Sequence, residues 1–221
     1  MDPWWRKAAD ASLGRGRLLW AFLPHVDQQP LVLVPEGRSE PTAHDSADFR
    51  VEPLRLGAPP PTPDLPVAGL PSFPGEVRAV YRAKRRPAII LGLGGDEVPA
   101  ALKTGAARYQ TQRTLLVAPY YGVDRDGRRG GWRPEFVSRI QRCEYPQYVW
   151  DSLPIGGVRE SVLRLDHLQP LSGHGQAYQL TEFCLSPDAL MLMDEWLDWL
   201  LTGGLPGDSV LADLRRELLN S

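Results

Sequence analysis

An arginine and an aspartate two positions apart form the sharpest pair of reactive side chains in the sequence. Arg164 and Asp166 fall in a run, residues 162–168, whose alternation predicts a β-strand, so both side chains should point to one face. An arginine keeps a neighbouring carboxylate anionic and can bind a phosphate through two hydrogen bonds. A carboxylate that takes the ribose 2′-hydroxyl proton, beside a guanidinium that stabilises phosphoryl charge, is what metal-free cleavage of an RNA phosphodiester requires. From this spacing alone, a surface ion pair is the alternative.

A group of basic residues is the second candidate site. Five cations occur within nine positions, at the end of a strand-like run at residues 76–82 and the start of the next at residues 87–93, so they would meet at a hairpin tip. They are Arg78, Arg82, Lys84, Arg85 and Arg86. Cations that project together into solvent can neutralise the phosphates of a nucleic acid, and a solvated turn is the alternative. Arg128 and Arg129 would add charge from a glycine-rich turn at residues 122–131.

The distribution of charge also favours a polyanion as ligand. The net charge is −2, yet residues 71–184 carry 16 basic and 11 acidic side chains, whereas residues 185–221 carry 2 basic and 7 acidic ones. The basic middle of the chain can attract nucleic acid. The acidic C-terminal stretch would cover that surface or simply keep the protein soluble. An ordinary solvated surface is the alternative.

Other motifs exclude several kinds of site. The four histidines lack the paired spacing of a zinc site, so no metal and no other cofactor is expected. Cys143 and Cys184, the two cysteines, form no disulfide framework, and we expect both thiols to be reduced and partly buried. The glycines at residues 92–95 follow a strand but match neither phosphate-binding glycine pattern, which indicates a plain turn.

Length and composition set the frame for these residues. With 221 residues, of which 43% are hydrophobic and 24% charged, the chain is typical of soluble globular proteins and neither collagen-like, coiled-coil nor fully disordered. It lacks a signal-peptide-like start and any run of about 18 apolar residues, so we expect a cytoplasmic protein. We divide it into an α+β extension (residues 1–56), a proline-rich linker (57–74), a main domain (75–203) and a terminal helix (204–221).

The main domain has the pattern of a small, strongly curved antiparallel sheet or barrel followed by helices. We expect a short helix from Pro134 to about residue 143 and strands at residues 76–82, 87–93, 114–121, 148–150 and 162–168. A long helix should begin after Ser186, a good N-cap, and end at Gly203. A second amphipathic helix should follow at about residues 208–219.

The order of these segments resembles the PemK/MazF toxins of bacterial toxin–antitoxin modules. The resemblance covers roughly residues 72–202 and rests on the helix after Ser186 and on Gly75-Glu76-Val77, Arg86-Pro87-Ala88-Ile89-Ile90-Leu91, Leu116-Val117-Ala118-Pro119 and Arg164-Leu165-Asp166-His167-Leu168-Gln169-Pro170-Leu171. It implies a mainly β fold, an SH3-like barrel with a C-terminal helix, and a homodimer. Active members of this family are metal-independent endoribonucleases that cut single-stranded RNA, leave a 2′,3′-cyclic phosphate and are blocked by an antitoxin.

The resemblance also implies roles for individual residues. Arg164 and Asp166 match the catalytic pair of some PemK-type members, and Arg86 matches an arginine that others use at the phosphate. Asp166 would be the general base, while Arg82, Lys84, Arg85, Arg128 and Arg129 would steer the RNA.

Two features depart from the family pattern. The basic segment at residues 81–85 replaces a longer loop rich in glycine and histidine. Tyr121 stands where MazF-type members place a catalytic serine or threonine after the third strand; it can stack a base or donate a hydrogen bond.

These departures keep other functions open. A catalytically degenerate barrel could serve as a protein-interaction or regulatory module, with an antitoxin or another protein as partner and no membrane. Residues 1–70 would then build part of the binding surface, or act as a built-in regulator of the barrel. Inhibition of DNA gyrase is a third alternative, by analogy with toxins of the same fold.

Overall fold

The computed structural model describes residues 3–43, 45–58, 74–105, 111–124, 131–156 and 160–220. The chain forms two units, one made of Met1–Leu23 with Arg85–Ser221 and the other of Pro24–Lys84. This division differs from the extension expected at residues 1–56, because the first 23 residues join the main unit. Most of the expected proline-rich linker, residues 59–73, lies outside the described residues.

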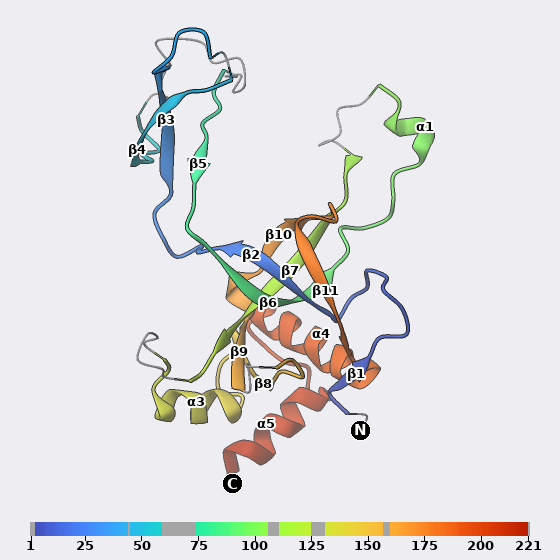
Figure 1. Ribbon diagram of the computed structural model, residues 1–221. Helices are drawn as coiled ribbons and strands as arrows, with labels where there is room; N and C mark the ends of the chain where they lie inside the picture. The colour runs from blue at the N-terminus through green and yellow to red at the C-terminus, as the bar shows by residue number, and fades with distance from the viewer. Residues whose placement is uncertain are drawn as a thin grey trace. The chain divides into compact units, whose positions relative to one another are not determined.

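The main unit is built on a curled antiparallel sheet with C-terminal helices beside it (Figure 1), which confirms the expected mainly β class. The strand order is β1-β11-β2-β6-β7-β9-β8, and β10 pairs with β7. The strands are β1 (Trp5–Lys7), β2 (Arg17–Pro24), β6 (Ala83–Gly92), β7 (Thr114–Gly122), β8 (Tyr148–Ser152), β9 (Glu160–Arg164), β10 (Gln169–Ser172) and β11 (Tyr178–Leu185).

Both faces of the central strands are buried, which explains their continuous apolar sequences. On β6, Ile89 packs into one core cluster, whereas its neighbours Ala88 and Ile90 pack into a second cluster. Likewise on β7, Ala118 belongs to the first cluster and Val117 to the second. The two clusters form because the sheet curls and β10 and β11 complete the second side. The central strands therefore hold the residues at their ends rigidly.

Three helices begin and end largely where the sequence predicts: α3 (Pro134–Gln141), α4 (Pro187–Thr202) and α5 (Val210–Asn220). The short helix α1 (Ala100–Lys103) was not predicted. At the start of α4 the Ser186 hydroxyl accepts a hydrogen bond from the Ala189 amide, and at its end Gly203 adopts a left-handed conformation with φ 80°. Glu195 of α4 caps α5, since its carboxylate accepts hydrogen bonds from the Leu211 amide and the Ser209 hydroxyl, each 2.7 Å long.

The smaller unit is a three-stranded sheet. It contains β3 (Leu31–Gly37), β4 (Asp48–Pro53) and β5 (Ala79–Val80) in the order β4-β3-β5, all antiparallel. The expected strand at residues 76–82 is thus only two residues long and pairs with β3, not with β6. The hairpin expected between residues 76–82 and 87–93 does not form, because the chain passes from one unit to the other there.

Both cysteines are unpaired and buried, as expected. Burial raises the pKa of the Cys143 thiol from 9.0 to about 11. At pH 8 the fraction of this thiol that is ionised to thiolate is therefore about a hundredfold smaller than for an ordinary cysteine. We therefore expect iodoacetamide at pH 8 to leave both thiols of the native protein unmodified and to alkylate both in guanidinium. Mass spectrometry of the two samples measures this, and rapid native alkylation of Cys143 would contradict the burial described here.

Candidate active site

Arg164 and Asp166 form a bidentate ion pair, but not through the pleat of one strand. β9 ends at Arg164, and Leu165–His167 form a single 3-10 turn before β10 begins. The continuous strand expected at residues 162–168 is therefore interrupted. Leu163 and Leu165 are buried in the core, and this anchors the turn that brings Asp166 back toward Arg164. Arg164 donates from Nε to Asp166 Oδ1 (2.7 Å) and from Nη2 to Oδ2 (2.6 Å).

The ion pair is only partly open to solvent. The side chain of Arg164 is 19% exposed and that of Asp166 is 33% exposed. Burial lowers the pKa of Arg164, but the hydrogen bonds to Asp166 and its charge outweigh this effect, so the pKa is raised and the guanidinium stays charged. A fixed cation beside a carboxylate that solvent still reaches is a suitable arrangement for binding a phosphate.

Tyr121 links this ion pair to two further side chains. Its hydroxyl lies 2.7 Å from Nδ1 of His167, and the two rings meet edge to face with centroids 5.5 Å apart. The guanidinium carbon of Arg86 lies 4.1 Å from the centroid of the Tyr121 ring, and that of Arg164 lies 5.9 Å from it. Two cations therefore approach one aromatic ring.

Strand register explains why these residues meet. β6 and β7 pair antiparallel with Ala88 opposite Pro119, and continuing that register places Arg86 opposite Tyr121. β7 then pairs with β9, which ends at Arg164, and the turn after β9 supplies Asp166 and His167. Three neighbouring strands thus deliver five polar side chains to one end of the sheet. We call Arg86, Tyr121, Arg164, Asp166 and His167 the five-residue cluster.

His167 is the residue that sequence reasoning missed. No role was expected for it from the sequence, because its partner Tyr121 lies 46 positions away and no local pattern indicates their contact. Its side chain is buried, with 7% of the residue exposed. Among the described residues, no three histidine, cysteine or acidic side chains stand close enough to hold a metal ion. His167 therefore belongs to a hydrogen-bonded pair with Tyr121.

The other basic residues are divided between the two units. Arg82 and Lys84 belong to the smaller unit, whereas Arg85 belongs to the main one. Arg85 donates to the side chain of Gln179 (2.9 Å) and its guanidinium carbon lies 4.5 Å from the centroid of Trp20. Neighbouring positions of a strand face opposite ways, so Arg85 and Arg86 serve different faces. Arg128 and Arg129 lie outside the described residues.

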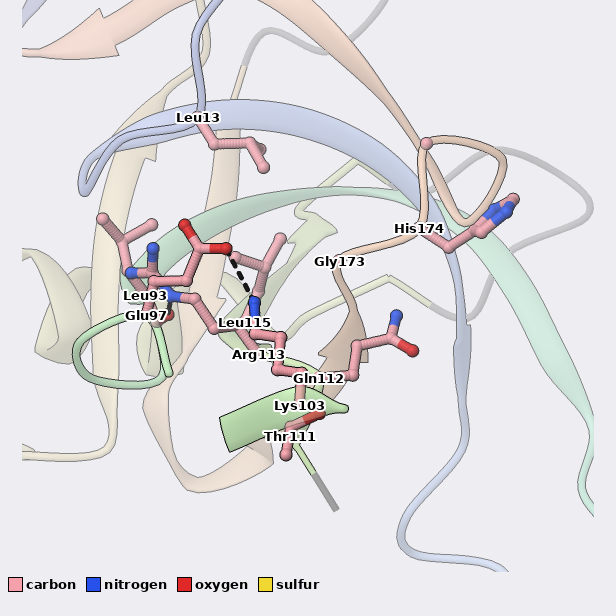
Figure 2. Close-up of a pocket in the computed structure, with 11 residues that line it drawn as sticks. Leu13, Leu93, Glu97, Lys103, Thr111, Gln112, Arg113, Leu115, Gly173 and His174 are labelled. Carbon is pink, nitrogen blue, oxygen red and sulfur yellow. Dashed lines mark hydrogen bonds and ion pairs between the residues drawn. The ribbon is translucent and has the colours of Figure 1, made fainter. Parts of the chain in front are cut away.

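A separate pocket of about 570 Å³ opens elsewhere in the main unit. Figure 2 shows Glu97 and Lys103 directed toward each other inside it, with Nζ and Oε1 2.8 Å apart. Arg113, on another wall, donates to the carbonyl oxygen of Leu93. Its described lining residues include no member of the five-residue cluster.

The turn after β6, which begins at Leu93 in the pocket lining, needs glycine at position 94. Gly94 has φ 71°, and a Cβ at this position would lie 2.3 Å from the carbonyl oxygen of Thr114. The glycines thus allow the close approach of two backbone segments, in agreement with the plain turn expected from the sequence.

No protein-family model, curated protein or solved structure matches the chain. Within the described parts of the chain, no helix has the length and apolar character needed to cross a membrane.

Proposed function

We propose that this protein is a metal-independent endoribonuclease that cleaves single-stranded RNA at the five-residue cluster, on an SH3-like barrel of the PemK/MazF type. The observation that carries the proposal is the convergence of two arginines, one carboxylate and a tyrosine–histidine pair at the end of one sheet. Such a set can stabilise phosphoryl charge, accept a proton and donate a proton, and these are the three tasks of the reaction.

The reaction is an attack by the ribose 2′-oxygen on the adjacent phosphorus. Asp166 accepts the proton of the 2′-hydroxyl as the bond between the 2′-oxygen and phosphorus forms. The bond from phosphorus to the 5′-oxygen then breaks, and Tyr121 gives its hydroxyl proton to that oxygen. The tyrosinate that forms accepts a hydrogen bond from Nδ1–H of His167 and is reprotonated by the proton that Asp166 took up, which restores the site. The products are a 2′,3′-cyclic phosphate and a 5′-hydroxyl end, and no water or metal enters this step.

The two arginines bind and polarise the phosphate in this scheme. A guanidinium has five N–H donors, and Arg164 uses two of them toward Asp166, which leaves an edge for a phosphate oxygen. Arg86, whose guanidinium carbon lies 4.1 Å from the centroid of the Tyr121 ring, supplies a second cation. Arginine does not act as the proton donor, since its pKa exceeds about 12.

Cleavage of a chimeric oligonucleotide tests this proposal. A labelled single-stranded RNA of mixed sequence, incubated with the protein in EDTA, should give discrete cuts. A single 2′-deoxy substitution on the 5′ side of a mapped cut should abolish that cut alone, because the nucleophile is missing. Cleavage that persists at the deoxy position would show that the 2′-oxygen is not the nucleophile and would overturn the mechanism.

A further inference from the structure

Four aromatic side chains form a cluster next to the five-residue cluster. Trp132 and Phe136 are stacked, with centroids 5.6 Å apart and planes at 14°. Tyr148 meets both of them edge to face, at 5.8 Å and 5.4 Å, and Tyr145 lies 5.4 Å from Phe136. We call these four rings the aromatic shelf. They differ from the core residue Tyr120, which is 2% exposed, because each of the four keeps part of its surface open to solvent.

The shelf is held in place by the same strands that build the active site. The Trp132 amide donates to the carbonyl oxygen of Val123, directly after β7. Phe136 lies on α3, which packs against β8 through a face that buries Val137 and Ile140. Figure 1 shows α3 beside β8 and β9. The rings are therefore ordered at the surface and are not covered by the core.

Arg164 connects the shelf with the phosphate site. Tyr148 lies opposite Arg164 in the β8–β9 register, and the Arg164 guanidinium carbon is 5.0 Å from the centroid of the Tyr148 ring. The same guanidinium holds Asp166. Tyr145 also lies 6.0 Å from Tyr148, so the four rings form one compact cluster, and the guanidinium carbon of Arg139 lies 4.8 Å from the centroid of Tyr145. A cluster of partly exposed rings beside the guanidinium of Arg164 complements a flat base joined to a phosphate.

We propose that the aromatic shelf is a stacking subsite for an unpaired nucleobase, adjacent to the phosphate held at Arg164. This inference rests on the proposed function and adds the binding mode of its substrate. Stacking on a ring face does not depend on the identity of the base, because every base has a π-face. A base within a duplex is already stacked on both sides, so the shelf selects single strands.

Binding of an RNA that cannot be cut tests the shelf separately from cleavage. The probe is a fluorescein-labelled, fully 2′-O-methylated single-stranded RNA of mixed sequence, and fluorescence anisotropy in EDTA reports its affinity. We expect Trp132→Ala to weaken binding about tenfold and Trp132→Phe, which keeps an aromatic ring, to restore most of the affinity. Phe22→Ala is the matched control, since Phe22 is an aromatic residue of β2 that is 68% exposed and lies outside the shelf.

The outcomes separate the two proposals. If Trp132→Ala binds the probe as tightly as the wild type, the shelf is not a subsite, whether or not the protein cleaves RNA. If Trp132→Ala weakens binding, Trp132→Phe restores it and no RNA is cut, the subsite stands and the nuclease proposal fails. If Trp132→Phe binds as poorly as Trp132→Ala, or if the wild type does not bind the probe, stacking on the shelf is overturned.

Discussion

The substitution Asp166→Asn is expected to lower the rate of RNA cleavage by about a thousandfold, while RNA binding persists. Asparagine has nearly the shape of aspartate but cannot accept the proton of the 2′-hydroxyl. Asp166 is the carboxylate of the five-residue cluster, and both of its oxygens face Arg164. The guanidinium keeps its place at the end of β9, so the phosphate retains its main cation.

Single-turnover cleavage of a labelled single-stranded RNA in EDTA measures this effect, and anisotropy with the 2′-O-methylated probe measures binding. Asp213→Asn is the matched control, because Asp213 also pairs with an arginine, Arg216, at 2.8 Å on the exposed surface of α5. The control should cleave at the wild-type rate. A full rate in Asp166→Asn would remove this carboxylate from the mechanism.

The substitution Asp151→Ala is expected to cost about 3–5 kcal/mol of the free energy of unfolding. Asp151 of β8 is buried and accepts three hydrogen bonds from side chains in the main core. They come from Trp4 Nε1 (3.2 Å), Trp5 Nε1 (3.0 Å) and the Tyr120 hydroxyl (2.9 Å). Alanine would leave the buried Tyr120 hydroxyl and two partly buried indole N–H groups without their acceptor, and it would loosen β1, which begins at Trp5.

The stability difference should also depend on pH. Burial raises the pKa of Asp151, although the hydrogen bonds from Trp5, Tyr120 and Trp4 lower it in part. The pKa in the folded state therefore exceeds the unfolded value of about 3.9, and the protonated form favours folding. This contribution is present below pH about 3.9 and is lost as the pH rises through the folded pKa. The difference between wild type and Asp151→Ala should accordingly be larger in acid than at neutral pH.

Guanidinium unfolding of wild type, Asp151→Ala and the surface control Asp213→Ala at pH 4 and pH 8 measures both effects. The surface control should unfold like the wild type. Equal stability of wild type and Asp151→Ala would show that this carboxylate does not fasten the N-terminal strand to the sheet.

Local sequence signals predicted the elements that depend on local chemistry. The helix between Ser186 and Gly203 was predicted because its caps are fixed by residues within the helix itself. The pairing of Arg164 with Asp166 was anticipated because the two residues are neighbours, even though a turn and not a strand brings them together. In both cases the physical cause lies within a few positions along the chain.

Contacts between distant segments were not predictable in this way. The hairpin expected at the basic residues assumes that consecutive strands pair, whereas β5 pairs with β3 and β6 with β7. β1 and β2 join the main sheet by pairing with β11, and Trp5 of β1 also donates to Asp151, 146 positions away in sequence. The contact of Tyr121 with His167 follows only from the β7–β9 pairing.

The chemical nature of the ends produced from a single-stranded RNA in EDTA tests the central claim most directly. Attack by the 2′-oxygen at the five-residue cluster should leave a 2′,3′-cyclic phosphate on one fragment and a 5′-hydroxyl on the other, and Asp166→Asn should yield neither. Fragments with a 3′-hydroxyl and a 5′-phosphate would contradict the mechanism. Intact RNA at micromolar protein would contradict the nuclease assignment and favour a protein-interaction module.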